Sequence, residues 1–116
     1  MINDQITDSV TQIIKYKDGH GGGRPSKIVY KIVEDTTYDD ALAKYMNPSE
    51  PHLPTIEECD TFHEYMGSTF SEKLRLTREL RNDTTVTCAN FRDRIYVGKP
   101  REDKYPLVLI YIEYMP

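Results

Sequence analysis

The 116-residue sequence lacks the features that mark membrane proteins and secreted proteins. Its longest apolar run, residues 107–112, is far shorter than the ~20 residues that cross a bilayer as a helix. The first residues are polar and acidic, without the basic start and apolar run of a secretory signal. The two cysteines, Cys59 and Cys88, have no CxxC spacing, so reduced thiols are expected. These absences predict a soluble, cytoplasmic protein without membrane contact.

Motifs for catalysis and cofactor binding are also absent. The glycine-rich segment 19–23 has no GxxxxGK[ST] spacing, and it precedes a predicted strand, whereas the dinucleotide fingerprint precedes a helix. The segment is predicted to be a flexible connection, with a backbone anion nest as the alternative. No GxSxG nucleophile motif occurs. No cofactor is therefore expected.

Residues of metal-ligating types gather in one segment, and five of them stand between positions 52 and 64: His52, Cys59, Asp60, His63 and Glu64. Two i, i+4 pairs occur among them, the spacing that places two ligands on one helix face. The zinc-binding motif HExxH is absent, because Gly67 stands at the position, four residues after His63, where the motif requires its second histidine. Cys59 next to Phe62 is more simply a small core residue. We expect no metal site.

Composition predicts a folded domain. Hydrophobic residues make up 38% of the chain, and the twelve aromatic residues are more than a disordered chain normally carries. A chain of this length indicates a single domain over residues 1–116. Residues 4–16 carry apolar side chains at helical spacing, but several are β-branched, so a helix and a strand both stay open.

Local signals predict the remaining elements. Residues 27–33 alternate as a strand. Thr37 and Thr55 are predicted N-caps of two helices, the second with a Thr55–Glu58 capping box and a left-handed Gly67 at its end. The capping-box spacing recurs at residues 69 and 72 and predicts a third helix, which would carry a polar stripe of Arg75, Arg78 and Arg81.

Three strands are predicted after the helices, at 84–89, 94–97 and 105–115. Residues 107–112 are apolar on both faces, which is typical of a central strand packed between layers. The sequence therefore predicts an α+β fold: a single compact domain in which an antiparallel sheet of about four strands has two or three helices packed on one face.

Charge is segregated along the chain, although the net charge is only −4. Residues 34–64 hold nine acids and one base, whereas residues 73–104 hold nine bases and five acids. Such asymmetry indicates how a protein meets its partners. Arginines beside aromatic residues bind phosphates or form protein contacts, with ordinary solvated charge as the alternative. The candidate ligand-binding residues are Arg24, Phe91, Arg92, Arg94 and Tyr96.

These observations predict a small, soluble, non-enzymatic binding protein that acts by stoichiometric contact. An inhibitor, adaptor or ligand-sequestering protein of the kind that phages and mobile elements encode fits this description. The expected partner is a host protein or a small phosphate-containing ligand, and a closed homo-oligomer is expected. The alternative is a phosphate-handling enzyme, such as a small ribonuclease or a nucleotide-processing protein, which would use His20 or His63 with Arg24, Arg92 and Arg94.

Overall fold

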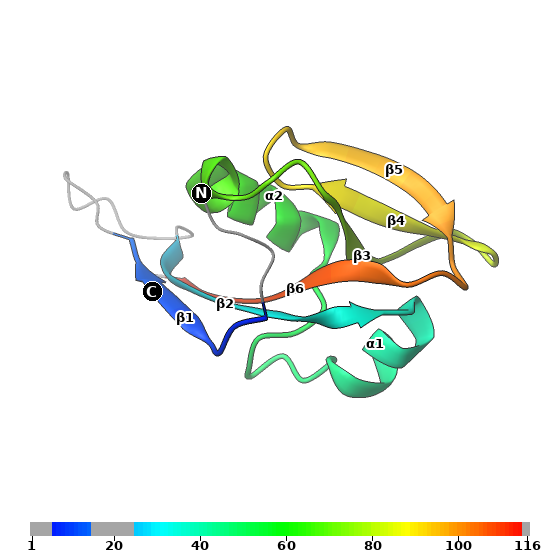
Figure 1. Cartoon of the computed structure of the whole chain (residues 1–116). Coiled ribbons are helices and arrows are strands. Elements are labelled where there is room, and N and C mark those ends of the chain that lie inside the picture. Colours follow the sequence, from blue (N-terminus) through cyan, green and yellow to red (C-terminus); the bar gives the residue numbers. More distant parts are fainter. Residues whose placement is uncertain (1–5, 15–24, 115–116) are drawn as a thin grey trace.

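The computed structural model describes residues 6–14 and 25–114. They form two antiparallel sheets of three strands and two helices (Figure 1). The first sheet, in the order β1–β2–β6, consists of Val10–Ile13, Pro25–Thr36 and Tyr105–Tyr114. The second, in the order β3–β4–β5, consists of Leu74–Asn82, Thr85–Asn90 and Ile95–Pro100. Between the sheets in sequence stand α1 (Tyr38–Lys44), α2 (Ile56–Met66) and the 3₁₀ turn η1 (Gly67–Thr69). This compact domain fits the expected α+β class, with two sheets in place of one.

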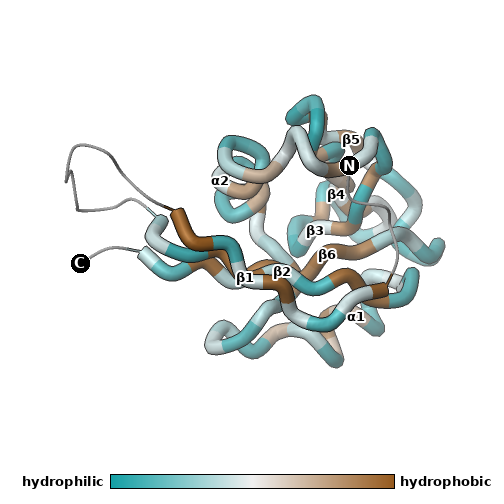
Figure 2. The backbone as a smooth tube through the Cα atoms, turned by 60° about the vertical axis from the view of Figure 1, so that its left-hand side comes forward, coloured by the Kyte–Doolittle hydropathy of each residue, from teal (hydrophilic) through white to brown (hydrophobic). Residues whose placement is uncertain are grey.

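Strand β6 separates two hydrophobic clusters. Val108, Ile110 and Ile112 pack in a cluster with α2, whereas Leu107 and Leu109 pack in a cluster with α1. The two helices therefore lie on opposite faces of the first sheet, and the prediction that helices pack on one face is wrong. In Figure 2, β6 carries hydrophobic positions at the centre of the molecule. Burial on both faces is as predicted, but β2 is the central strand of this sheet.

An aromatic cluster joins segments that are distant in sequence. The ring of Phe62 on α2 lies 5.1 Å from those of Phe70 and Phe91 and 5.9 Å from that of Tyr30, measured between centroids. All four rings are buried. The guanidinium of Arg75 lies 5.2 Å from the centroid of Phe70. Such contacts add to hydrophobic burial, so they fix α2 against the end of β4.

Both predicted helix starts are confirmed. Thr37 accepts a hydrogen bond from the amide of Asp40 at 3.2 Å. Thr55 and Glu58 form the complete capping box at the start of α2. The predicted ending of α2 is wrong, because Gly67 has the right-handed values φ −57° and ψ −39°. A Cβ atom at this position would overlap the carbonyl oxygen of Phe91, so close approach requires the glycine.

The predicted third helix does not form. Residues 67–69 make η1, and β3 begins at Leu74. Leu74, Leu76 and Leu80 also fit the period of two that a strand requires, and long-range pairing of Leu76 with Cys88 and of Leu80 with Val86 decides in favour of the strand. Local spacing alone does not contain this information.

The predicted arginine stripe is lost with that helix. The side chain of Arg75 is fully buried. Arg78 Nε donates to the carbonyl oxygen of Leu53 at 3.2 Å, and Arg81 Nη2 donates to that of Tyr96 at 3.3 Å. These three arginines serve internal contacts and do not form a common binding surface.

A helix and a strand both stayed open for residues 4–16. Residues 10–13 form a strand, since they pair with residues 27–30. The glycine-rich segment 19–23, with His20, and the candidate residue Arg24 lie outside the described residues. Neither α1 nor α2 has the length and the apolar character that a bilayer-crossing helix needs, and the described chain contains no other α-helix.

Candidate functional site

The turn between β4 and β5, residues 91–94, is held rigidly by Asn90. Asn90 Oδ1 accepts hydrogen bonds from the amides of Arg92 and Asp93 at 3.0 and 3.2 Å, and Asn90 Nδ2 donates to Asp93 Oδ2 at 3.0 Å. Asparagine commonly braces turns in this way. The Arg92 side chain is exposed, and within residues 6–14 and 25–114 its guanidinium has no hydrogen-bonding partner. The turn thus presents a cation on a rigid support.

Arg94 ends this turn in the left-handed region, with φ 56°, and is the single non-glycine residue with positive φ among those described. A residue with a Cβ in this conformation carries a cost of about 1–2 kcal/mol. Arg94 Nε donates to Asp60 Oδ1 on α2 at 3.1 Å. This ion pair holds the end of the turn against α2. Because it lies at the surface, its net contribution to folding stability is below about 1 kcal/mol.

Asp60 is the junction of the site. Besides Arg94, the hydroxyl of Tyr96 on β5 donates to Asp60 Oδ1. The hydrogen bond from Tyr96 lowers the pKa of Asp60, with a further lowering from the hydrogen bond and the charge of Arg94. Burial raises the pKa of Tyr96, and its hydrogen bond to Asp60 raises it further. Asp60 is therefore a carboxylate and Tyr96 a neutral phenol at neutral pH.

His63 stands one helical turn after Asp60. Its Nδ1 faces the carbonyl oxygen of Phe91, which only accepts, so Nδ1 carries the proton of the neutral ring. Nε2 of the neutral ring is then left as an acceptor. This hydrogen bond from His63 Nδ1 also connects α2 directly to Phe91, the first residue of the turn.

An open cavity of about 580 Å³ lies between α2 and the turn. Its lining is polar and consists of Asp60, Thr61, His63, Glu64 and Arg94. Within the described chain the two Nη atoms of Arg94 make no hydrogen bond, so they are available to a ligand. We call the exposed parts of Asp60, His63, Glu64, Arg92 and Arg94, with the Tyr96 hydroxyl, the turn surface. It combines two carboxylates with two guanidinium groups.

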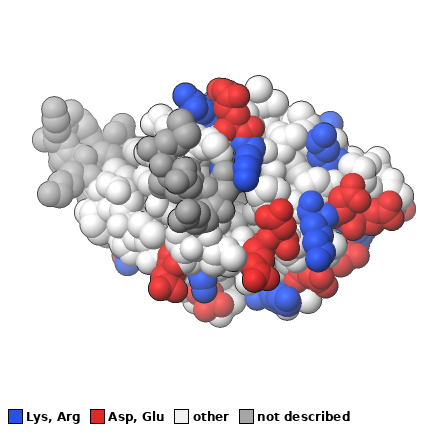
Figure 3. All heavy atoms as spheres, viewed as in Figure 1, with Lys and Arg blue, Asp and Glu red and all other residues white. Residues whose placement is uncertain are grey.

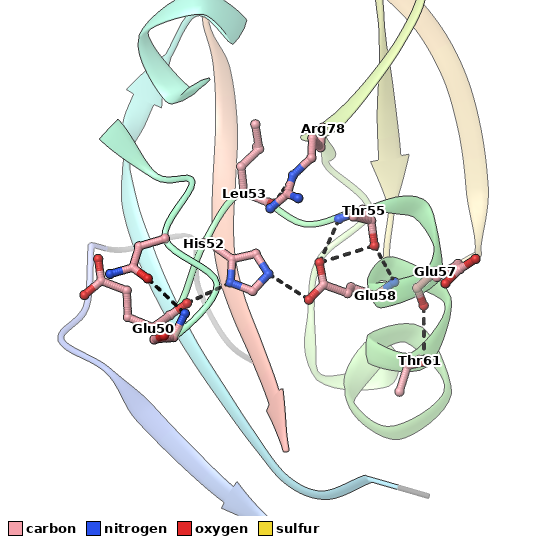
Figure 4. A network of polar contacts seen from close by, with 10 residues as sticks. Glu50, His52, Leu53, Thr55, Glu57, Glu58, Thr61 and Arg78 are labelled. Carbon is pink, nitrogen blue, oxygen red and sulfur yellow. Dashed lines mark hydrogen bonds and ion pairs between the residues drawn. The ribbon is translucent and has the colours of Figure 1, made fainter. Parts of the chain in front are cut away.

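A buried polar network fixes the start of α2 (Figure 4). The side chain of His52 contacts the carbonyl oxygen of Glu50 through Nδ1 at 2.7 Å and Glu58 Oε2 through Nε2 at 2.8 Å. Glu58 Oε1 accepts from the amide and the hydroxyl of Thr55 at 3.0 and 3.2 Å. One carboxylate thus completes the capping box and binds the histidine, which positions the helix that carries Asp60 and His63.

A second open cavity, of about 520 Å³, lies beside the loop after β5. Its main cation, Arg101, is already occupied: Nε and Nη2 donate to Asp39 Oδ1 at 3.0 and 2.7 Å, and Nη1 donates to the carbonyl oxygen of Asp83 at 3.2 Å. The guanidinium also lies 5.3 Å from the ring centroid of Tyr38. Arg101 therefore joins this loop to α1, and Lys99 is the second cation that lines the cavity.

Of the five predicted ligand-binding residues, Arg94 and Tyr96 meet at Asp60, and Arg92 is exposed in the same turn. Phe91 is 1% exposed and belongs to the core, so only its carbonyl oxygen reaches the site. The sequence did not predict Asp60 as a member of this surface, whereas the enzyme alternative grouped His63 with Arg92 and Arg94. The i, i+3 spacing of Asp60 and His63 on a predicted helix was a signal for a shared face, but nothing in the sequence linked Asp60 to a turn about 30 residues away.

Of the five ligand-type residues between positions 52 and 64, Asp60, His63 and Glu64 line one cavity, and the other two lie elsewhere. Cys59 is fully buried, His52 faces Glu58, and His63 faces the turn. Among residues 6–14 and 25–114, no three side chains of histidine, cysteine, aspartate or glutamate stand close enough to hold a metal ion.

Comparison of the chain with models of protein families, with curated proteins and with solved structures gives no match. The chemistry of the turn surface is therefore what a functional proposal has to rest on.

Proposed function

We propose that this protein is a small, soluble, non-enzymatic binding protein that acts by stoichiometric contact through the turn surface. The observation that carries the proposal is the strained, left-handed Arg94, held by Asp60 on a turn that Asn90 braces. Strain of this kind persists where the surroundings impose it and gathers at functional sites. A rigid scaffold that presents exposed loop side chains is the usual arrangement for recognition.

The charges of the turn surface favour a protein partner over a small phosphate-containing ligand. Asp60 and Glu64 line the same cavity as Arg94. A phosphate group carries a charge of about −1.5 to −2 and would lie next to both carboxylates. A protein surface with basic and acidic side chains complements both signs at once, and Arg92 then serves as an exposed anchor.

The test compares two charge reversals of equal size. Arg92→Glu changes the proposed contact, and Lys104→Glu is the matched control, since Lys104 is exposed and has no ion-pair partner in the described chain. Tagged proteins are used to capture partners from a lysate of the encoding organism, and the eluates are analysed by native mass spectrometry. We expect a one-to-one complex with the wild type and with Lys104→Glu, and its loss with Arg92→Glu. A complex that survives Arg92→Glu and Arg94→Ala contradicts the proposal.

A phosphate-handling enzyme is the second candidate, and one observation favours it. His63 Nε2 is left as a proton acceptor, and His63 and the free Nη donors of Arg94 line one cavity. Turnover separates the two functions, because a binder leaves its ligand intact. Release of phosphate or cleavage of RNA by the wild type, lost in His63→Gln and kept in the control Lys104→Glu, would favour the enzyme.

A further inference from the structure

Strand β1 has an outer edge that faces away from β2, and the pairing with β2 shows which backbone N–H and C=O groups point outward there. Within the described residues, β1 pairs only with β2. The amide of Ile14 donates to the carbonyl oxygen of Ser26 at 2.9 Å. In an antiparallel pair, alternate residues direct both backbone groups to the neighbouring strand. The backbone N–H and C=O groups of Gln12, like those of Ile14, therefore point toward β2, whereas those of Thr11 and Ile13 point outward.

This edge lacks the usual protection against pairing. Exposed edges normally carry a lysine, a proline or a bulge, but residues 9–14 contain neither charge nor proline, and the register of β1 with β2 is regular. All four residues of β1 are exposed. Six large apolar side chains of the described residues are exposed, and three of them, Ile6, Val10 and Ile13, lie on or just before this strand. Figure 1 shows β1 at the margin of the sheet.

We propose that β1 pairs antiparallel with β1 of a second copy of this chain, about a two-fold axis at Gln12. The outward groups of Thr11 and Ile13 are placed symmetrically around Gln12, so Thr11 of each copy meets Ile13 of the other. Four backbone hydrogen bonds result, and the two three-stranded sheets join into one sheet of six strands. Such a contact is isologous and closes as a dimer.

The side chains across this axis are compatible. Gln12 stands opposite Gln12 of the second copy, and Val10 stands opposite Ile14 of the second copy, so the pairing brings no like charges together and forms apolar cross-strand contacts. A second copy fits this edge because the pattern of outward groups is its own complement. A four-residue edge makes a small interface, and association is expected between about 10 µM and 1 mM.

Charge pairing across the two-fold axis provides the test. Gln12 is exposed and opposite its own copy, so Gln12→Lys and Gln12→Glu each create a like-charge pair in the dimer. Sedimentation velocity is recorded from about 10 µM to 1 mM, the range in which small interfaces act. We expect a dimer for the wild type, monomers for each variant alone, and a restored dimer in their equimolar mixture. Ser68→Lys, at an exposed position in η1, should dimerise as the wild type does, and circular dichroism checks that each variant is folded.

Three results would overturn the proposal. One is a wild type that stays monomeric up to 1 mM, and another is a Gln12 variant that dimerises as the wild type does. In the third, the mixture of the two charged variants stays monomeric, which would refute the axis at Gln12. Each result is independent of the turn surface, because β1 contributes no residue to it.

Discussion

Removal of the His52–Glu58 contact should destabilise the fold more than loss of a helix cap does. The two side chains are only 7% and 20% exposed. Both ring nitrogens of His52 face oxygen atoms, the carbonyl oxygen of Glu50 and the carboxyl oxygen of Glu58. A hydrogen bond to a charged group contributes about 1.5–3 kcal/mol, and a helix cap contributes about 1 kcal/mol.

These magnitudes give an ordered series of unfolding free energies. Thr55→Ala loses the cap alone and should cost about 1 kcal/mol. Glu58→Ala keeps the bond from the backbone amide of residue 58 to Thr55, but it loses the carboxylate half of the capping box and leaves His52 Nε2 without its partner, so it should cost about 3 kcal/mol. In Glu58→Gln, the amide oxygen keeps an acceptor for Thr55 and the amide nitrogen still reaches His52 Nε2, so the loss should be below about 1 kcal/mol. His52→Ala with Glu58→Ala should show a coupling of about 1–2 kcal/mol.

Urea denaturation monitored by circular dichroism measures these differences, since the chain has no tryptophan for a fluorescence assay. The matched control is Glu57→Ala, which removes an exposed carboxylate from the same turn of α2 and should change stability by about 0.5 kcal/mol or less. Additive single mutants, with no coupling between His52 and Glu58, would refute the reasoning. A cost for Glu57→Ala as large as that for Glu58→Ala would do so too.

Three further predictions concern buried or tightly packed groups. Burial raises the pKa of Cys59 well above its ordinary value and that of Cys88 to about 11, so iodoacetamide should label both thiols at pH 8 only in urea, as followed by mass spectrometry, and labelling of the folded protein would contradict this. The pKa of Asp60 is lower in the folded protein, so its contribution to folding stability is present above about pH 4 and is lost as the pH falls through the folded pKa. Asp60→Asn should therefore cost below about 1 kcal/mol of unfolding free energy at pH 7, and less at pH 3, as measured by urea denaturation. Gly67→Ala should destabilise by about 1–3 kcal/mol despite its better helix propensity, because the new Cβ would overlap the Phe91 carbonyl oxygen and lie 2.9 Å from His63 Nδ1, and an unchanged melting temperature would show that the turn gives way.

The charge segregation of the sequence largely disappears in the folded chain. Asp60 of the acidic segment pairs with Arg94 of the basic segment, and Asp39 pairs with Arg101. Figure 3 shows both signs of charge interspersed on the face that it displays. On this face the acidic segment of the sequence does not form a surface of one sign (Figure 3). The apolar residues 107–110 and 112 of β6 are buried inside the domain, and the outer edge of β1 is the surface proposed for self-association.

Features that depend on neighbours within a few residues could be predicted from the sequence. The caps at Thr37 and Thr55, the strand over residues 27–33 and the apolar run of β6 follow from side-chain chemistry and periodicity over a few residues. Tertiary structure decided the rest, because several patterns are locally ambiguous. Leucines at 74, 76 and 80 fit a helix and a strand, and pairing with β4 selects the strand. The turn surface also depends on long-range contacts: Asp60 meets Arg94 and Tyr96 only because Phe62 and Phe91 pack together in the core, 29 residues apart in the chain.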